Sequence, residues 1–242
     1  MKTIERFANL LSCSTINGWR NQLFNLGNEF GYEKILLAIL PDQCAQPEMK
    51  LTFLQSNYSD EWISRYDAEK LGLIDPIVTH CANKSTPLIW IPDIFADRKQ
   101  KEMYEEACGY GIRSGVTLPL HGMKGELGAL CFVTDVKPDK RFQRDTNFNL
   151  PELSCLRDFV IESSQRFIER PCLEKNIYLT SRELECLKWC ARGKGSWEIG
   201  NLLNCTEATV NFHFKNIRAK FNTTSRHLAI VRAINLGLIN PF

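Results

Sequence analysis

The chain has 242 residues, of which 44% are hydrophobic and 24% charged, with a formal net charge of +2. This composition is that of an ordinary globular protein with one large or two modest domains. No apolar run approaches the roughly 20 residues that span a bilayer. The N-terminal sequence MKTIERFANLL has Glu5 and Arg6 where a signal peptide needs apolar residues. We therefore expect a cytoplasmic protein without membrane contact.

The first two thirds of the chain mix strand and helix patterns. Strand-like runs occupy 32–40, 49–55, 115–122 and 126–135. Runs with apolar residues three and four apart, typical of amphipathic helices, occupy 59–71, 96–111 and 150–169. We therefore predict an N-terminal α/β domain over residues 1–169, an α-β-α sandwich with a central antiparallel sheet.

The periodicity stops after Glu169, in the sequence RPCLEKNIY. Pro171 cannot continue a helix, so we place a linker at 170–177. From Tyr178 onward there are nine Lys and Arg against four Glu, a net charge of +5, whereas the rest of the chain carries −3. A basic segment attached to a mildly acidic body indicates that residues 178–242 meet nucleic acid.

Residues 178–242 are predicted to be almost entirely helical. Thr180 and Glu183 form the pattern of a capping box, and Gly193 and Gly195 end the helix that follows. A short second helix lies in SWEIGNLLN, where we expect Ile199, Leu202 and Leu203 to face inward. Thr206 is then expected to cap a third helix, EATVNFHFKNIRAKF.

The third helix separates an apolar face from a polar one. Its apolar row has core spacing and consists of Val210, Phe214, Ile217 and Phe221, while a polar stripe one residue along consists of Asn211, Lys215 and Arg218. A short helix, a turn and a helix with outward amide and cationic groups is the helix-turn-helix arrangement, whose stripe can enter the major groove. There, Asn suits adenine and Lys suits guanine or phosphate. The alternative is a solvated polar face.

Over residues 178–242 the chain resembles the DNA-binding domain of LuxR/FixJ type. The resemblance is carried by Leu179, Thr180, Arg182, Glu183, Glu185, Leu187, Gly193, Ile199, Thr209, Val210, His213, Ile217 and Lys220. It departs at Asn211, where the family often has Lys. It implies double-stranded DNA as a partner, with DNA-facing positions at Thr206, Thr209, Asn211, His213, Lys215, Arg218 and Lys220.

In the N-terminal domain, the segment LGLIDPIV places a single carboxylate, Asp75, among apolar residues. Asp before Pro commonly opens a turn by bonding nearby backbone. Alternatively Asp75 is a buried acceptor, which is costly unless protein or ligand supplies a donor. Upstream, Tyr58, Trp62 and Tyr66 recur every four residues on one helix face, either as plain core or as an aromatic wall with polar donors.

These residues, together with Pro76, Trp90, Gly115 and the segment PLHGMKGELGAL, resemble the autoinducer-binding domain of LuxR-type quorum-sensing regulators, most closely of pseudomonad type. The likeness covers most of residues 5–168. It implies an N-acyl-homoserine lactone as ligand, with Asp75 accepting from the amide N–H, Trp62 donating to the lactone carbonyl and Tyr58 donating to the amide carbonyl. It further implies that Trp90 stacks near the lactone ring, and that the pocket is lined by Tyr66, Val78, Leu40 and Leu127.

The sequence departs from this family at Cys131, where related receptors often have a Ser or Thr that faces the amide carbonyl. A thiol is a weak donor, so we expect Tyr58 to hold that carbonyl almost alone. Ile63 and Ile77 likewise offer no polar contact to a 3-oxo group. We therefore expect a preference for unsubstituted acyl chains.

Taken together, these features predict a ligand-responsive transcriptional regulator of quorum sensing that binds a two-fold symmetric DNA site as a homodimer, with RNA polymerase as a further partner. One alternative is an orphan receptor that responds to foreign or non-lactone signals, or that acts without ligand.

An enzyme is the other alternative, with Cys131, Cys108 or Asp75 as the reacting group. Such chemistry would need a nearby His, and His80 and His121 fit no triad pattern, so we predict no catalytic residue. His213 also lacks partners at useful spacing. The ten cysteines include no C-x-x-C pair and no Cys/His cluster at zinc spacing, so we expect reduced, mostly buried thiols and no metal or cofactor.

Overall fold

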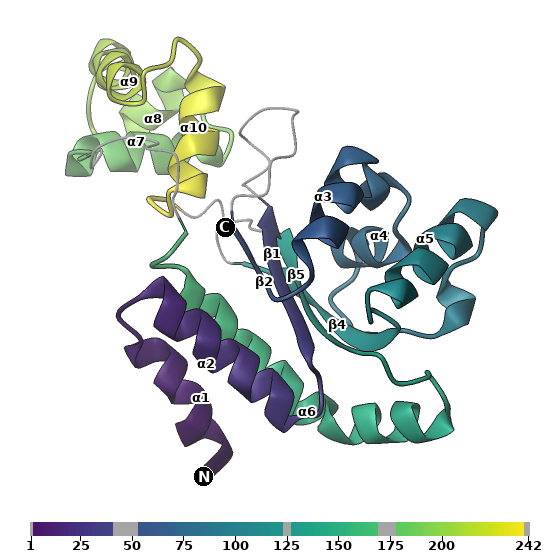
Figure 1. Ribbon diagram of the computed structural model, residues 1–242. Coiled ribbons are helices and arrows are strands. Elements are labelled where there is room, and N and C mark those ends of the chain that lie inside the picture. Colours follow the sequence, from purple (N-terminus) through teal and green to yellow (C-terminus); the bar gives the residue numbers. More distant parts are fainter. Residues whose placement is uncertain (1, 41–52, 123–126, 169–177, 240–242) are drawn as a thin grey trace. The chain divides into compact units, whose positions relative to one another are not determined.

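The computed structural model describes residues 2–40, 53–122, 127–168 and 178–239 (Figure 1). The chain divides into two compact units, Met1–Glu169 and Arg170–Phe242. The linker expected at 170–177 lies outside the described residues. Each unit has its own hydrophobic core and is considered separately.

The first unit is built on an antiparallel sheet. Its strands are β1 (Lys34–Leu40), β2 (Phe53–Ser56), β3 (Leu88–Ile89), β4 (Ser114–His121) and β5 (Leu127–Thr134), in the order β2-β1-β5-β4-β3. In this register Thr117 of β4 lies opposite Cys131 of β5. Gly115 is required by the close approach of these strands, because a Cβ at this position would lie 2.5 Å from the carbonyl oxygen of Phe132.

Helices cover both faces of the sheet (Figure 1). On one side lie α1 (Lys2–Ser12), α2 (Ile16–Glu29) and α6 (Lys140–Ser164), and on the other α3 (Asp60–Ala68), α4 (Pro76–Asn83) and α5 (Arg98–Gly109). Two short 3-10 helices, η1 (Leu71–Leu73) and η2 (Pro92–Ile94), join elements on the second side. The predicted α-β-α sandwich with a central antiparallel sheet is confirmed.

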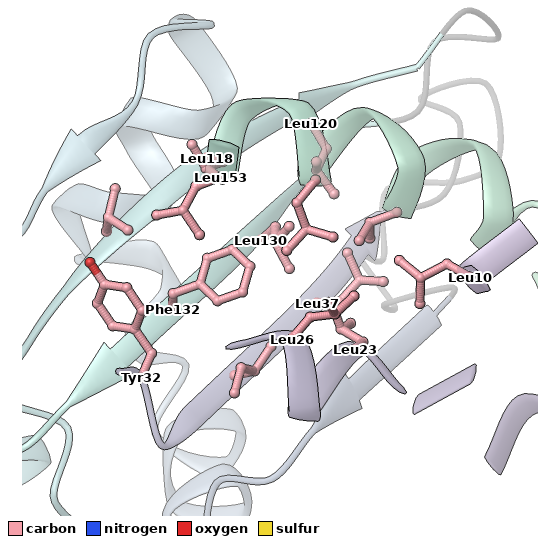
Figure 2. Close-up of a cluster of buried hydrophobic side chains, with 14 of the residues drawn as sticks. Leu10, Leu23, Leu26, Tyr32, Leu37, Leu118, Leu120, Leu130, Phe132 and Leu153 are labelled. Atoms are coloured by element: carbon pink, nitrogen blue, oxygen red, sulfur yellow. The ribbon is translucent and has the colours of Figure 1, made fainter. Parts of the chain in front are cut away.

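The two faces of the sheet carry separate hydrophobic clusters. Figure 2 shows the first, in which Phe132 packs among leucines of the strands and of α1, α2 and α6. The next residues on either side, Cys131 and Val133, belong to the second cluster, beneath α3, α4 and α5. Successive strand residues point to opposite faces, so one strand serves both cores.

Some elements differ from those expected. α6 begins at Lys140, ten residues before the predicted start, and continues through Pro151. Figure 1 shows α6 changing direction along its length, as expected where an interior proline removes a helical hydrogen bond. Sequence patterns also did not indicate α1, α2 or α4. α4 is missed because Asp75-Pro76, which suggested a turn, is instead the N-cap and first residue of this helix.

The second unit consists, in its described part, of α7 (Ser181–Ala191), α8 (Ser196–Leu202), α9 (Glu207–Lys220) and α10 (Arg226–Asn235). The capping box is confirmed, since Thr180 accepts from the Glu183 N–H and Glu183 accepts from the Thr180 N–H. The apolar row Val210, Phe214, Ile217 and Phe221 is buried as predicted. Leu202 was expected to face inward and is 48% exposed, because it is the last residue of α8 and only Ile199 of that helix's large apolar side chains is fully buried.

Candidate functional site

Asp75 caps α4 and also accepts a hydrogen bond from a side chain of α3. One carboxylate oxygen accepts from the backbone N–H of Ile77 at 2.8 Å, and the other accepts from the hydroxyl of Tyr66, also at 2.8 Å. The residue is only 7% exposed. Burial raises the pKa of Asp75, and these hydrogen bonds act against that rise. A carboxylate offers about four acceptor positions, so Asp75 keeps spare acceptor capacity beside these two bonds and the bond from the backbone N–H of Val78.

Tyr58 presents the opposite situation, a donor without an acceptor. Its hydroxyl is buried and has no hydrogen-bond partner among the described residues. Burial raises the pKa of Tyr58 well above its usual value, so the hydroxyl keeps its proton. A buried polar group without a partner costs about 1–3 kcal/mol. Such groups are rare in folded proteins, and each one calls for an explanation.

A third polar group lies deeper, on the sheet. The indole N–H of Trp90 donates to the hydroxyl of Thr117 at 2.8 Å, and this hydroxyl lies 3.2 Å from the thiol of Cys131. All three residues are buried. Thr117 was not among the residues singled out from the sequence, although a Thr within the apolar strand GVTLPLHG was a signal for it. Its hydroxyl accepts from Trp90, so its own proton is available to Cys131 or to a ligand.

Aromatic rings surround these polar groups. The ring of Trp62 meets that of Tyr66 edge-on, with centroids 6.0 Å apart, and lies 5.4 Å from that of Tyr110. Tyr58, Trp62, Tyr66, Trp90 and Cys131 all belong to the second cluster, so the structure brings together residues from α3, β5 and the segments beside them.

The other residues predicted to line the pocket lie outside the second cluster or outside the described side chains. Val78 and Leu127 are half-buried and are not part of the second cluster. Leu40 is the last residue of β1, and its side chain lies outside the described part of the structure. Burial raises the pKa of the thiols of Cys131 and Cys108, so neither is the thiolate that nucleophilic catalysis would require.

In the second unit, α8 and α9 form the predicted helix pair. Thr206 caps α9 by accepting from the Thr209 N–H at 3.2 Å, and the two hydroxyls lie 2.9 Å apart. Thr206, Thr209, Asn211 and Lys215 are exposed on this helix, whereas His213 is half-buried.

The amide of Asn211 is held by neighbouring helices. The Ser196 hydroxyl donates to its Oδ1 at 2.8 Å, and Arg226 donates to the Ser196 hydroxyl at 2.9 Å. The Arg226 guanidinium lies 3.4 Å from the centroid of the Phe214 ring, and its Nε and Nη2 are buried without partners among the described residues. These two hydrogen bonds fix the orientation of the Asn211 amide and leave its NH₂ group free to donate.

Arg218 and Lys220 bond to other groups of the same unit. Arg218 donates to the carbonyl oxygens of Phe214 and Thr224. The ammonium of Lys220 lies 2.6 Å from the carboxylate of buried Glu183 and donates to the Tyr178 carbonyl. Burial acts to raise the pKa of Glu183, but the bonds from Lys220 and from the Thr180 N–H outweigh it and hold this pKa below its usual value.

Neither unit offers a metal site or a membrane segment within its described part. No group of three His, Cys, Asp or Glu side chains there could hold a metal ion. No described helix is both long and apolar enough to cross a bilayer.

Comparison with known proteins identifies both units. Residues 15–164 match the family model described as autoinducer binding domain, and residues 178–233 match that of the bacterial regulatory proteins of the luxR family. The chain is 33% identical over 239 residues to the transcriptional activator protein VanR of Vibrio anguillarum, covering 92% of this chain and 91% of that one. It is 32% identical over 189 residues to the quorum-sensing regulator RhlR of Pseudomonas aeruginosa, covering 78% and 76% of the two chains.

Solved structures show the same fold. Escherichia coli SdiA has a TM-score of 0.75 and 25% identity, with 99% of this chain and 97% of that chain covered. SdiA in complex with octanoyl-rac-glycerol has a TM-score of 0.76 at 23% identity, with 96% and 93% covered.

Proposed function

The chain belongs to the LuxR family of bacterial regulators, and on this premise we propose that its signal is an N-acyl-homoserine lactone. The relatives reported above are transcriptional regulators rather than enzymes. The family assignment supplies autoinducer binding in the first unit and DNA binding in the second. The proposal adds the chemical class of the ligand, the residues that hold it, and the symmetry of the DNA site.

One observation carries the ligand proposal: a buried donor without a partner, Tyr58, and a buried acceptor with spare capacity, Asp75, belong to one aromatic region. A secondary amide is the group that supplies both complements, a carbonyl for Tyr58 and an N–H for Asp75. Trp62 is proposed to donate to the lactone carbonyl. Each buried bond contributes on the order of 1–3 kcal/mol, and each buried methylene of the acyl chain about 0.8 kcal/mol.

Thr117 changes the expected role of Cys131. The thiol is a weak donor, but the neighbouring hydroxyl has a proton to give because its oxygen already accepts from Trp90. We therefore assign the amide carbonyl to Tyr58 together with Thr117, rather than to Tyr58 almost alone. Ile77 is buried and Ile63 half-buried in the same cluster, which supports a preference for unsubstituted over 3-oxo chains. A titration with matched pairs of lactones that ranks the 3-oxo forms higher would contradict this preference.

The proposed output is binding of a homodimer to a two-fold symmetric promoter site, with α9 in the major groove and RNA polymerase as a further partner. Exposed Thr209, Asn211 and Lys215 support groove contact by α9. The internal bonds of Arg218 and Lys220 support a role for these two residues in holding the domain together.

An orphan receptor for a non-lactone signal remains the second candidate. SdiA, which shares this fold, has been solved with octanoyl-rac-glycerol, an acyl ester without an amide N–H. The two candidates differ in the group that donates to Asp75, which is an amide N–H in a lactone signal and a glycerol hydroxyl in octanoyl glycerol.

The deciding experiment is expression with and without a panel of acyl-homoserine lactones and octanoyl glycerol, followed by extraction and mass spectrometry of what co-purifies. We expect a lactone to be retained by the wild type and lost from Asp75→Asn, which keeps the N-cap to Ile77 but weakens the acceptor. Asp67→Asn, an exposed change on α3, is the matched control. Retention of lactone by Asp75→Asn would contradict the assigned role, and retention of octanoyl glycerol alone would favour the orphan receptor.

A further inference from the structure

Helix α9 carries a second row of residues with the spacing of its core row. The core row is Val210, Phe214, Ile217 and Phe221, all buried, and the row that starts two residues earlier is Ala208, Phe212, Lys215 and Ala219, all exposed. Each helical residue turns by about 100°, so a displacement of two residues rotates the row by about 200°. This outward row therefore lies opposite the core, whereas Asn211 lies on its flank and Lys215 belongs both to the outward row and to the polar stripe.

The centre of the outward row is an aromatic side chain. Phe212 is 59% exposed, and its ring contacts that of neighbouring His213 edge-on, with centroids 6.1 Å apart. In this row the turn before Phe212 has Ala208 and the turn after it has exposed Lys215, so the ring projects beyond its neighbour on the N-terminal side. Its position opposite the core means that it adds nothing to the packing of this domain.

The surroundings of Phe212 favour DNA over protein as the group that it contacts. Thr209, Asn211 and Lys215 are exposed around it, and the segment from Tyr178 onward has a net charge of +5. One ring between polar and cationic groups is too small for a stable protein interface, which buries upwards of about 1,000 Å². Base edges in the major groove offer one apolar group, the C5-methyl of thymine, beside acceptors that suit lysine.

We propose that Phe212 is a specificity-determining residue that packs against a thymine methyl group in each half of the DNA site. The inference rests on the proposed function of α9 as the groove-binding helix. It predicts discrimination of thymine from cytosine at one position of each half-site, because cytosine lacks the methyl group. The alanines at 208 and 219 let the helix approach closely enough for this contact.

The test begins by selecting a binding site from randomised DNA duplexes with the full chain, purified after expression with the lactone panel. Each thymine of the selected site is then replaced by deoxyuridine, which removes the methyl group alone. We expect about fourfold weaker binding at one thymine of each half-site, the effect of one buried methyl-sized group. Replacing the same thymine pair by cytosine should weaken binding, and 5-methylcytosine should restore part of the loss.

Variants separate the ring from the rest of the interface. In Phe212→Ala the deoxyuridine effect should disappear, whereas Phe148→Ala, the same change at a residue of α6 that is 84% exposed, should retain it. A selected site without any methyl dependence, or equal dependence in Phe212→Ala, would overturn the inference alone. A selection that enriches no sequence would overturn the proposed DNA recognition and the inference together.

Discussion

Tyr58→Phe should change stability and ligand affinity in opposite directions. The substitution removes one hydroxyl and keeps the ring, so the packing of the aromatic region is preserved. In the structure this hydroxyl is buried without a partner among the described residues, so its removal should relieve a desolvation cost. In the complex the same hydroxyl is proposed to donate to the amide carbonyl, and its removal leaves that carbonyl with Thr117 alone.

The two effects have different sizes. Relief of an unsatisfied hydroxyl should raise the free energy of unfolding by about 1 kcal/mol, which for a domain of this length raises the Tm by about 2–4 °C. Affinity for a lactone should fall by about 1–3 kcal/mol, a factor of roughly 5 to 150.

Thermal unfolding with and without added lactone measures both quantities, and Tyr66→Phe is the matched control. The Tyr66 hydroxyl has a partner, because it donates to Asp75 at 2.8 Å. Its removal should therefore destabilise the free protein by roughly 1–3 kcal/mol. A Tyr58→Phe variant whose ligand-free Tm falls as that of Tyr66→Phe does, with unchanged affinity, would refute the reasoning, since the hydroxyl would then have an acceptor inside the empty protein.

Three further predictions concern charge and hydrogen bonding. Burial raises the pKa of Asp75, so the folded protein binds the proton of this carboxyl more tightly than the unfolded chain does. The free energy of unfolding should therefore fall as pH rises from the usual carboxyl pKa through the raised one. Unfolding of wild type and Asp75→Asn measured over this pH range tests the prediction. Lys220→Met should lower the unfolding free energy by roughly 1–3 kcal/mol, after allowing for solvent around the ammonium, because Glu183 loses its ion pair. Lys215→Met, the matched variant, should instead lower DNA affinity at unchanged Tm. Equal Tm values for both variants would contradict the structural role assigned to Lys220. Ser196→Ala should weaken DNA binding several-fold, about 1 kcal/mol, by releasing the amide that it orients, and unaltered binding in an anisotropy titration would count against that positioning.

Local patterns were enough to predict much of the second unit. A capping box involves residues three apart, and the core row of α9 depends only on helical spacing, so Thr180, Glu183 and Val210 could be interpreted without knowing what they pack against. The same reasoning misplaced Leu202, because spacing alone does not say where a short helix ends.

The polar groups of the first unit were predicted by residue type but not by partner. Asp75 stood out as a carboxylate in an apolar segment, and it does bond nearby backbone, but as the cap of α4 rather than in a turn, and it also accepts from Tyr66. Thr117 was missed because its importance comes from Cys131, which lies 14 residues further along the chain and is brought opposite it by strand pairing.

The sequence by itself determined the two-domain organisation, the caps at Thr180 and Thr206, and the residue types from which a lactone and DNA are proposed as ligands, since all of these depend on composition, spacing or resemblance. Only the tertiary structure decided which groups have partners. Tyr58 lacks an acceptor, and Lys220 is paired with Glu183 across 37 residues of chain. Hydrogen bonds and ion pairs act over a few ångströms, and the chain fold, not sequence separation, determines which atoms come that close.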